Sequence, residues 1–410
     1  MGIVVIIIGL ALSIGLHEFG HLIPAKLFGV RVPNWAIGFG PKIFSKKIGE
    51  TEYSLRLIPL GGFITMIGMF PPDRKGKDST RRFGKLIAQS RAAHSEHIQP
   101  GDEGTRTLYS LPAWKRIIVM FGGPLVNLVL GLGILTYVFA TVGVPQQTTT
   151  VAKVEACIAQ MTGGACTANS EQTPAARSGM LANDKVVALD GKPVTDYASL
   201  QKELQASADP ITVTVERAGK NLDLVLPVAY ADLPYTDANG KQSSHRVRIM
   251  GLAFATVTKQ GGVGVGFKAA TNALGGTFSM VATFPEQIYK TIASTAEGQK
   301  RDPNGAVSVV GVAQASTTVN DFNYWLFLVG SLNIALFVFN MIPLPPLDGG
   351  HIAGGIYEYL KRGLFKLFRR KDPGPADTAL LAPFAQLMFL FLLVAGVLVM
   401  VADIVNPVQF

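Results

Sequence analysis

The sequence predicts an α-helical membrane protein with four transmembrane helices, a membrane-associated β-hairpin or small sheet, and an α+β domain outside the membrane. The chain has 410 residues, 48% of them hydrophobic, and a mean hydropathy of +0.32. Four segments are long and apolar enough to cross a hydrocarbon core of roughly 30 Å, which takes about 20 helical residues. Between the second and third segments, short apolar runs alternate with polar residues, as expected for strands and an amphipathic helix.

The transmembrane helices are predicted at residues 3–23, 114–141, 323–344 and 382–404. The first is not interpreted as a cleaved signal peptide, because no basic residues precede its apolar stretch. Residues 24–116 contain sixteen Lys and Arg against seven Asp and Glu, and residues 144–321 contain fifteen of each sign. The connection at 351–381 is again basic. The positive-inside rule therefore places the first and third connections in the cytoplasm, and both termini with residues 144–321 outside it.

The net charge of +9 does not require a nucleic-acid partner. The excess of basic residues lies beside the predicted spans, where it can interact with the anionic headgroups of the lipid bilayer. We therefore expect the bilayer, and no nucleic acid, as a partner of the chain.

His17-Glu18-Phe19-Gly20-His21 lies at the end of an otherwise uncharged apolar segment. Ionisable groups at membrane depth cost about 2.5–3.5 kcal/mol each on insertion scales, so they usually mark function. On a helix, His17 and His21 share one face and can offer two imidazole nitrogens to one metal ion, while Glu18 is placed to act as a general base. The alternative is a pair of neutral histidines packed inside the bundle.

A third metal ligand is predicted where the third span ends. Pro343, Pro345 and Pro346 cannot all stay in a regular helix, so the backbone must unwind before Asp348. Positive-inside orientation puts Asp348 near the cytoplasmic face, at about the depth of the two histidines, and zinc sites of this kind need a third protein ligand. The glycines that follow, Gly349 and Gly350, are expected to permit a tight turn. The alternative role for Asp348 is a helix cap.

The chain resembles the site-2 protease (M50) family of intramembrane zinc metalloproteases, in its bacterial branch with a PDZ domain. The resemblance rests on the histidine motif in the first span and on Asn340-Met-Ile-Pro-Leu-Pro-Pro-Leu-Asp348-Gly in the third. It implies that Zn²⁺ is bound by His17, His21 and Asp348, that Glu18 is the catalytic base, and that Asn340 holds the substrate backbone. Asn127, in Gly123-Pro-Leu-Val-Asn127, is a secondary substrate-binding candidate; helix packing explains it nearly as well.

Residues 48–69 are predicted to form two strands about a turn at 59–62, and they resemble the membrane-associated β-hairpin of the same family. An open sheet edge cannot face lipid, so it should border the active-site cavity and pair with an unwound substrate. Phe63 and Thr65 are the residues expected to take part. The alternative is a hairpin that only braces the bundle.

Residues 173–228 resemble a PDZ domain of the bacterial protease type, with a strand at 185–191, a helix at 197–205 and strands at 211–217 and 222–228. Tyr197, Leu200 and Leu204 form an apolar stripe that is expected to face the core. Residues 146–172 and 229–262 are expected to add outer strands or an insertion. This PDZ domain would bind peptide ends or exclude bulky substrates, and the sequence does not separate the two roles. Nor does it decide whether Cys157 and Cys166 are bridged or free.

The resulting domain prediction covers the whole chain: 1–72, the first transmembrane helix and hairpin; 73–110, a cytoplasmic insertion; 111–145, the second helix; 146–262, the extracytoplasmic PDZ domain; 263–320, an amphipathic connector; 321–350, the third helix; 351–381, a cytoplasmic loop; and 382–410, the fourth helix. His94 and His97, in the insertion, have metal-like spacing, but they are interpreted as part of a solvated linker.

The predicted function is a zinc-dependent endopeptidase, in a bacterial plasma membrane, that cuts single-pass transmembrane proteins. By resemblance, the substrates would be anti-sigma factors, other membrane regulators or signal-peptide remnants. One alternative is a non-catalytic membrane adaptor that recruits partners through its PDZ domain. Another is an ion transporter, which would need more polar groups in the outer halves of the spans than the sequence shows.

Overall fold

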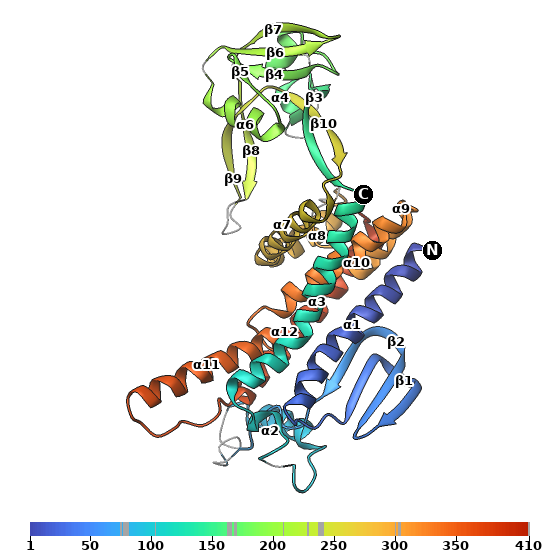
Figure 1. Cartoon of the computed structure of the whole chain (residues 1–410), viewed down its shortest axis with the longest axis vertical. Helices are drawn as coiled ribbons and strands as arrows, with labels where there is room; N and C mark the ends of the chain where they lie inside the picture. Colours follow the sequence, from blue (N-terminus) through green and yellow to red (C-terminus); the bar gives the residue numbers. More distant parts are fainter. Residues whose placement is uncertain are drawn as a thin grey trace. The chain divides into compact units, whose positions relative to one another are not determined.

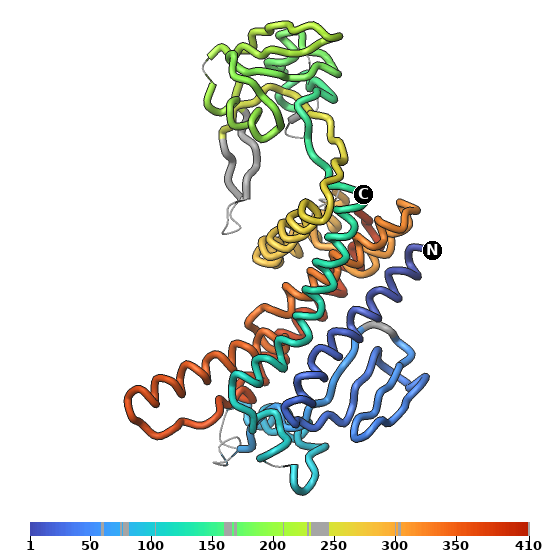
Figure 2. The backbone as a smooth tube through the Cα atoms, in the orientation of Figure 1, coloured from blue at the N-terminus to red at the C-terminus, as the bar shows by residue number. Residues whose placement is uncertain are grey.

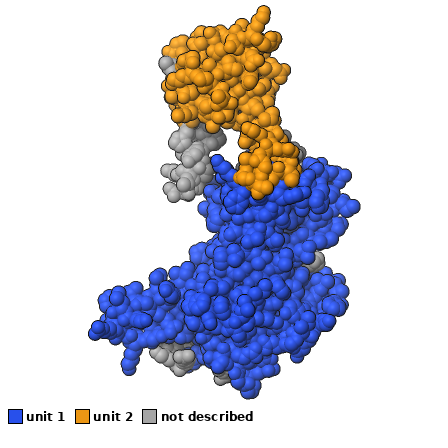
Figure 3. Space-filling model, viewed as in Figure 1, with its two compact units in different colours: residues 1–139, 266–410 blue, residues 140–265 orange. Residues whose placement is uncertain are grey.

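The computed structural model divides into two compact units, which are described separately: residues 1–139 with 266–410, and residues 140–265 (Figure 3). It describes all residues except 74–75, 77–81, 103, 162–165, 168–169, 208, 228, 237–241, 300, 302–304 and 409–410. Figure 2 traces the chain through both units.

Four long apolar helices form the first unit's framework: α1 (Gly2–Leu27), α3 (Ala113–Thr141), α10 (Phe322–Asn340) and α12 (Ala382–Val405) (Figure 1). Among the described residues, four helices are long and apolar enough to cross a membrane, which confirms this part of the predicted fold class. Many of their apolar side chains are exposed; Leu387, Phe389 and Leu393 of α12 are 52–65% exposed. Such a surface is what contact with lipid requires.

Shorter helices pack around this framework: α2 (Gly84–Ser95), α7 (Gly262–Ala282), α8 (Phe284–Ala296), α9 (Val309–Thr318) and α11 (Asp348–Leu367). α1 contacts both α9 and α10, and α12 contacts α8 and α9. A buried cluster that includes Leu22, Val119 and Ile352 joins α1, α3 and the start of α11. This cluster lies beside the metal-ligand candidate His21, which bonds to the backbone of Val119 within it.

Two bounds of the helical prediction are wrong. The third span ends at Asn340 instead of 344, because the proline-rich residues after it form turns. Residues 351–381 are not simply a loop, since α11 continues to Leu367. The sequence of this segment is basic and mostly exposed, as in a solvated loop, which is why the helix was not predicted. Its buried residues, such as Gly355 and Glu358, lie only on the side that packs against the bundle.

The hairpin in the structure also differs from the predicted one in the position of its turn and in its strand pairing. β1 (Asn34–Ile48) and β2 (Thr51–Thr65) form a two-stranded sheet whose connecting turn lies at Gly49 and Glu50, not at 59–62. Both strands bend, so that Ile37 lies opposite both Leu55 and Gly62. Residues 62–65 therefore pair with the start of β1 and not with residues 51–55. Glycine and proline at 59–62 mark this bend, and the sequence pattern could not distinguish it from a reversing turn.

The second unit is built on a sheet with strand order β10-β3-β4-β6-β7. The predicted inner elements are confirmed as β4 (Lys185–Leu189), α6 (Tyr197–Ala206), β6 (Ile211–Arg217) and β7 (Lys220–Leu226), and outer strands come from both flanks as β3 (Val144–Val154) and β10 (Leu252–Lys259). The smaller elements are α4 (Ile158–Met161), α5 (Pro174–Arg177), β5 (Lys192–Pro193), and the pair β8 (Ala229–Thr236) and β9 (Gln242–Ile249).

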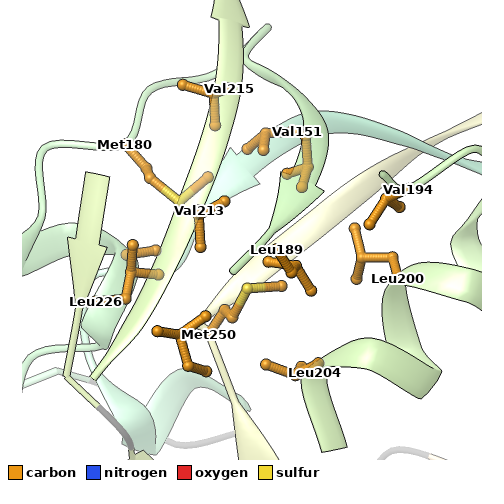
Figure 4. Close-up of a cluster of buried hydrophobic side chains, with 13 residues drawn as sticks. Val151, Met180, Leu189, Val194, Leu200, Leu204, Val213, Val215, Leu226 and Met250 are labelled. Carbon is orange, nitrogen blue, oxygen red and sulfur yellow. The ribbon is translucent and has the colours of Figure 1, made fainter. Parts of the chain in front are cut away.

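The core of this unit gathers apolar side chains from the sheet and from one face of α6 (Figure 4). Leu200 and Leu204 are buried there, as predicted, and Tyr197 is half-buried. α6 begins with a capping box in which the side chains of Asp196 and Ser199 bond to each other's backbone N–H. Cys157 and Cys166 form a disulfide bond, which answers the question that the sequence left open.

Candidate metal centre

Three side chains from two distant segments meet inside the first unit. α1 presents His17 and His21 on one face, and their Nε2 atoms lie 3.3 Å apart. The Oδ2 atom of Asp348 lies 3.3 Å from the Nε2 of His17 and 3.5 Å from that of His21. The structure therefore brings together the three residues that the sequence singled out as metal ligands, although they are separated by more than 300 positions in the chain.

The spacing of these atoms fits a tetrahedral zinc ion. Zinc lies about 2.0–2.2 Å from nitrogen and oxygen ligands, so two ligand atoms at a tetrahedral angle are about 3.3–3.5 Å apart. All three separations have this size. The buried Oδ2 of Asp348 also lacks a hydrogen-bond partner among the described residues. Such an atom is costly unless something satisfies it. The donor set of two imidazoles and one carboxylate is one that zinc prefers.

The backbone of α3 orients His21. Its Nδ1–H donates to the carbonyl oxygen of Val119, 2.8 Å away. Because a carbonyl only accepts, this bond assigns the proton to Nδ1 and leaves the lone pair on Nε2, which faces His17 and Asp348. Sequence reasoning did not find Val119, because a backbone acceptor carries no residue signature.

Glycines allow α3 to pass close enough to do this. A Cβ atom at Gly123 would lie 2.2 Å from the His21 Nε2, and one at Gly20 would lie 2.4 Å from the carbonyl oxygen of Gly122. Close approach through small residues is common between membrane helices. Any larger side chain at Gly123 would occupy the space of the metal centre itself.

The proline-rich turn places Asp348. α10 ends at Asn340, and α11 begins at Asp348 with Leu347 as its N-cap, without any side-chain capping bond. The alternative of Asp348 as a helix cap is therefore not supported. Gly349 lies against the carbonyl oxygens of Met341 and Ile342, which a Cβ would approach to 2.6 and 2.3 Å. These glycines let the start of α11 fold back tightly on the end of α10.

Glu18 is half-buried beside the ligands, and the sheet covers it from another side. A Cβ at Gly62 would lie 3.1 Å from the Cγ of Glu18 and 2.9 Å from a methyl carbon of Ile14. The segment 62–65 of β2 therefore runs directly past the candidate general base. Phe63 stacks on Phe39, and Thr65, at the end of β2, is half-buried.

The two asparagines predicted to contact substrate lie in different surroundings. Asn340 is half-buried at the last residue of α10. Asn127 lies one turn beyond Gly123 on α3, is fully buried, and has no hydrogen-bond partner for either amide atom among the described residues. An unsatisfied buried amide at this depth calls for a partner.

A polar contact between helices supports α1 one turn before the histidines. The Nδ2 of Asn333 on α10 donates to the Oγ of Ser13, 2.8 Å away, and both side chains are buried. Ser13 and His17 share one face of α1 because they are four positions apart. This hydrogen bond fixes the axial position and the rotation of α1, the helix that carries the two histidines. The sequence carried the signal as an asparagine within an apolar span, but the prediction did not use it.

His94 does not lie in a simple solvated linker. Its ring contacts Phe70 at a centroid distance of 4.8 Å, and its Nδ1 lies 2.8 Å from the carbonyl oxygen of Ser90. With Gly350 and His351, these residues line a cavity of about 400 Å³. Burial lowers the pKa of His351 below its ordinary range. The cavity thus adjoins the turn that carries Asp348, whereas His97 is exposed.

Comparison with known proteins agrees with this centre. The model of peptidase family M50 matches residues 5–370. The chain is 29% identical to the zinc metalloprotease Rip1 of Mycobacterium tuberculosis, over 100% of this chain and 98% of that protein. It is also 29% identical to Rip1 of Mycolicibacterium smegmatis, with the same coverage.

A solved structure of the HtrA3 PDZ domain bound to a phage-derived ligand covers 21% of this chain and 86% of its own, with 17% identity and a TM-score of 0.13. A score this low does not establish a common fold. The range that matches the family model includes both the histidine motif and the turn that carries Asp348. The chain therefore belongs to peptidase family M50.

Proposed function

We propose that this M50 peptidase is a zinc-dependent endopeptidase that cuts single-pass transmembrane proteins within the membrane. The observation that carries the proposal is the trio of His17, His21 and Asp348, whose ligand atoms are 3.3–3.5 Å apart at the end of a membrane-spanning helix. The relatives that match the chain over its whole length are named zinc metalloproteases. Three ionisable side chains that face one another at membrane depth are costly to bury, and such groups usually serve a function.

His17, His21 and Asp348 would hold the zinc ion, which when bound acts as a Lewis acid that polarises a peptide carbonyl and activates water. The proton of His21 stays on Nδ1 through its bond to Val119. Glu18 would accept the proton from the attacking water and pass it to the leaving amine. β2 covers this side of the centre and would limit the access of bulk water to Glu18.

A substrate helix must unwind before its backbone reaches these residues. We propose that residues 62–65 replace the lost helical hydrogen bonds by pairing with the unwound strand, with Phe63 and Thr65 at the contact. The proposal is supported by the position of Gly62 beside Glu18 and by the pairing of this segment with only the start of β1. Asn340 and Asn127 would hold the substrate backbone through their amides.

Sidedness follows from charge. We propose a bacterial plasma-membrane location in which the basic connections face the cytoplasm, and both termini and the second unit lie outside. We keep the predicted domain bounds except for the third span, which ends at Asn340, and for residues 351–381, which include most of α11. Residues 146–262 would be a PDZ domain that binds peptide ends or excludes substrates with bulky ectodomains. Substrates would be anti-sigma factors, other membrane regulators or signal-peptide remnants.

Metal content tests the proposal directly. The purified full chain should contain about one zinc ion per molecule, as expected for a site of three protein ligands. His21→Gln and Asp348→Ala should lose most of this zinc, whereas His97→Gln, which removes an exposed histidine, should retain it. Elemental mass spectrometry measures the content. A chelator should abolish cleavage of a tagged transmembrane substrate, and added zinc should restore it. Equal zinc in all four proteins would contradict the assignment of the ligands.

The edge-strand role makes a separate prediction. Phe63→Pro or Thr65→Pro should lower the turnover of a transmembrane substrate by about tenfold or more, because proline cannot donate a backbone hydrogen bond to a paired peptide. Zinc content should not change. Ser45→Pro is the control, because residue 45 lies in the part of β1 that pairs with residues 51–55. If all three variants kept wild-type turnover, the sheet would have only a bracing role.

A further inference from the structure

α11 continues well beyond the metal centre as an amphipathic helix with a basic end (Figure 1). Tyr359, Arg362 and Lys366 follow each other within α11 at intervals of three or four residues, and Arg370 lies three residues beyond the end of the helix at Leu367. Such spacing places residues on one face of a helix. This face turns toward the first residues of α3, since the same four side chains and Trp114 line one cavity.

The cavity has a volume of about 620 Å³, and its floor includes Ala113 at the start of α3. The unpaired backbone N–H groups of a helix's first turn favour a negative charge nearby. Basic side chains on one wall and a helix N-terminus on the other therefore create a site for an anion.

The charges in this cavity are not balanced by the protein. Arg362 is paired with Asp372 and with Glu358. Lys366 and Arg370, in contrast, form no ion pair with any residue that the structure describes. With three cationic side chains and the single carboxylate of Asp372 in its lining, the cavity carries a net charge of 3 − 1 = +2.

Neighbouring apolar groups indicate what kind of anion fits. On the adjacent face of α11, Ile356, Leu360, Leu364 and Leu367 form a stripe in which each side chain is 47–77% exposed. Exposed aromatic residues flank the cavity: Trp114 is 49% exposed at the second residue of a membrane-spanning helix, and Tyr359 is 61% exposed. Trp and Tyr prefer the level of the lipid headgroups.

We propose that this cavity binds the phosphate headgroup of an anionic phospholipid, whose acyl chains lie along the apolar stripe of α11. Lys366 and Arg370 would contact the phosphate, and Trp114 and Tyr359 would border the glycerol region. Basic pockets between membrane helices are a known way of binding such headgroups. A free phosphate ion would use the same cations but would leave the apolar stripe uncovered. Because α11 begins at Asp348, the lipid would hold the far end of the helix that presents this carboxylate.

Native mass spectrometry of the full chain in a non-ionic detergent tests the proposal, because the micelle has no surface charge of its own. The probes are phosphatidylglycerol, phosphatidylcholine and inorganic phosphate. Wild type should retain phosphatidylglycerol in preference to phosphatidylcholine. Lys366→Gln/Arg370→Gln should weaken this binding about thirty-fold, if each cation contributes as basic residues do near anionic lipid.

Lys361→Gln/Arg369→Gln is the matched control, because it removes one lysine and one arginine charge from α11 and the turn after it, at positions that do not line this cavity. It should bind phosphatidylglycerol like wild type. Equal loss in both double variants would show general charge attraction and overturn the site. Displacement of the lipid by an equal concentration of inorganic phosphate would assign the cavity to a free anion instead. Melting temperatures without lipid show that each variant is folded, so a loss of binding cannot be mistaken for unfolding.

Discussion

Glu18→Gln should abolish most peptide cleavage without removing the metal. General base catalysis contributes about 10²–10⁴-fold to a rate, equivalent to about 2.7–5.5 kcal/mol of barrier. Glutamine keeps the shape of the side chain and its packing against Gly62, but it cannot accept a proton. Turnover of a tagged transmembrane substrate by the purified protein should therefore fall by this factor, while the zinc content stays at the wild-type value.

The control for Glu18→Gln is Glu52→Gln, which also removes one negative charge. Glu52 lies in the hairpin and pairs with the exposed Lys42, and surface pairs of this kind contribute at most about 1 kcal/mol. Its turnover should match wild type. Equal cleavage by wild type and Glu18→Gln would mean that another group is the base. A loss of zinc in Glu18→Gln would instead show that Glu18 supports the metal site and would leave its chemical role unproven.

Asp403→Ala should destabilise the first unit more than any surface substitution. Asp403, near the end of α12, and Arg301 are each only 1% exposed, and their ion pair is 2.6 Å long. The second oxygen of Asp403 accepts the backbone N–H of Ser308 at 2.7 Å, and Arg301 donates to the carbonyl oxygen of Ala306. Removing one partner leaves the other charge buried, which costs about 3–5 kcal/mol.

Unfolding in a denaturing detergent titration measures this effect. Glu286→Gln is the control, because it breaks only an exposed pair within α8, worth about 0.3–0.5 kcal/mol. Replacing both partners, as in Arg301→Met/Asp403→Leu, should recover much of the stability, because no charge is then left unpaired. If Asp403→Ala unfolded at the same point as Glu286→Gln, the buried pair would not hold α12 to the segment before α9.

The same pair bears on the transporter alternative. The prediction noted few polar groups in the outer halves of the spans, and the buried polar groups of the helices have partners: Asp403 lies near the end of α12, and Ser13 and Asn333 bond to each other between α1 and α10. None of them forms a continuous path. Arg301 neutralises Asp403, and the amide of Asn333 is used to join two helices. These groups serve packing, and they do not revive the transporter alternative.

Local pattern by itself determined the four spans, the candidate ligands and the inner strands of the second unit. Apolar length predicts a membrane helix, a spacing of four residues puts His17 and His21 on one face, and alternation predicts strands such as 211–217. Each of these signals is contained within about twenty neighbouring residues, so no knowledge of the rest of the chain is needed to read it.

Tertiary structure decided what depends on contacts between distant residues. The pairing of residues 62–65 with the start of β1, the bond from His21 to Val119, and the packing of α11 through Gly355 and Glu358 all depend on residues far apart in the sequence. Glycine and proline occur in bends and in reversing turns, so the sequence could not separate the two at residues 59–62. A backbone carbonyl such as that of Val119 has no sequence signature. A basic amphipathic stretch forms a stable helix mainly when one of its faces is buried. Asp348 could be nominated as a ligand from its motif, but only folding brings its oxygen within 3.5 Å of both histidines.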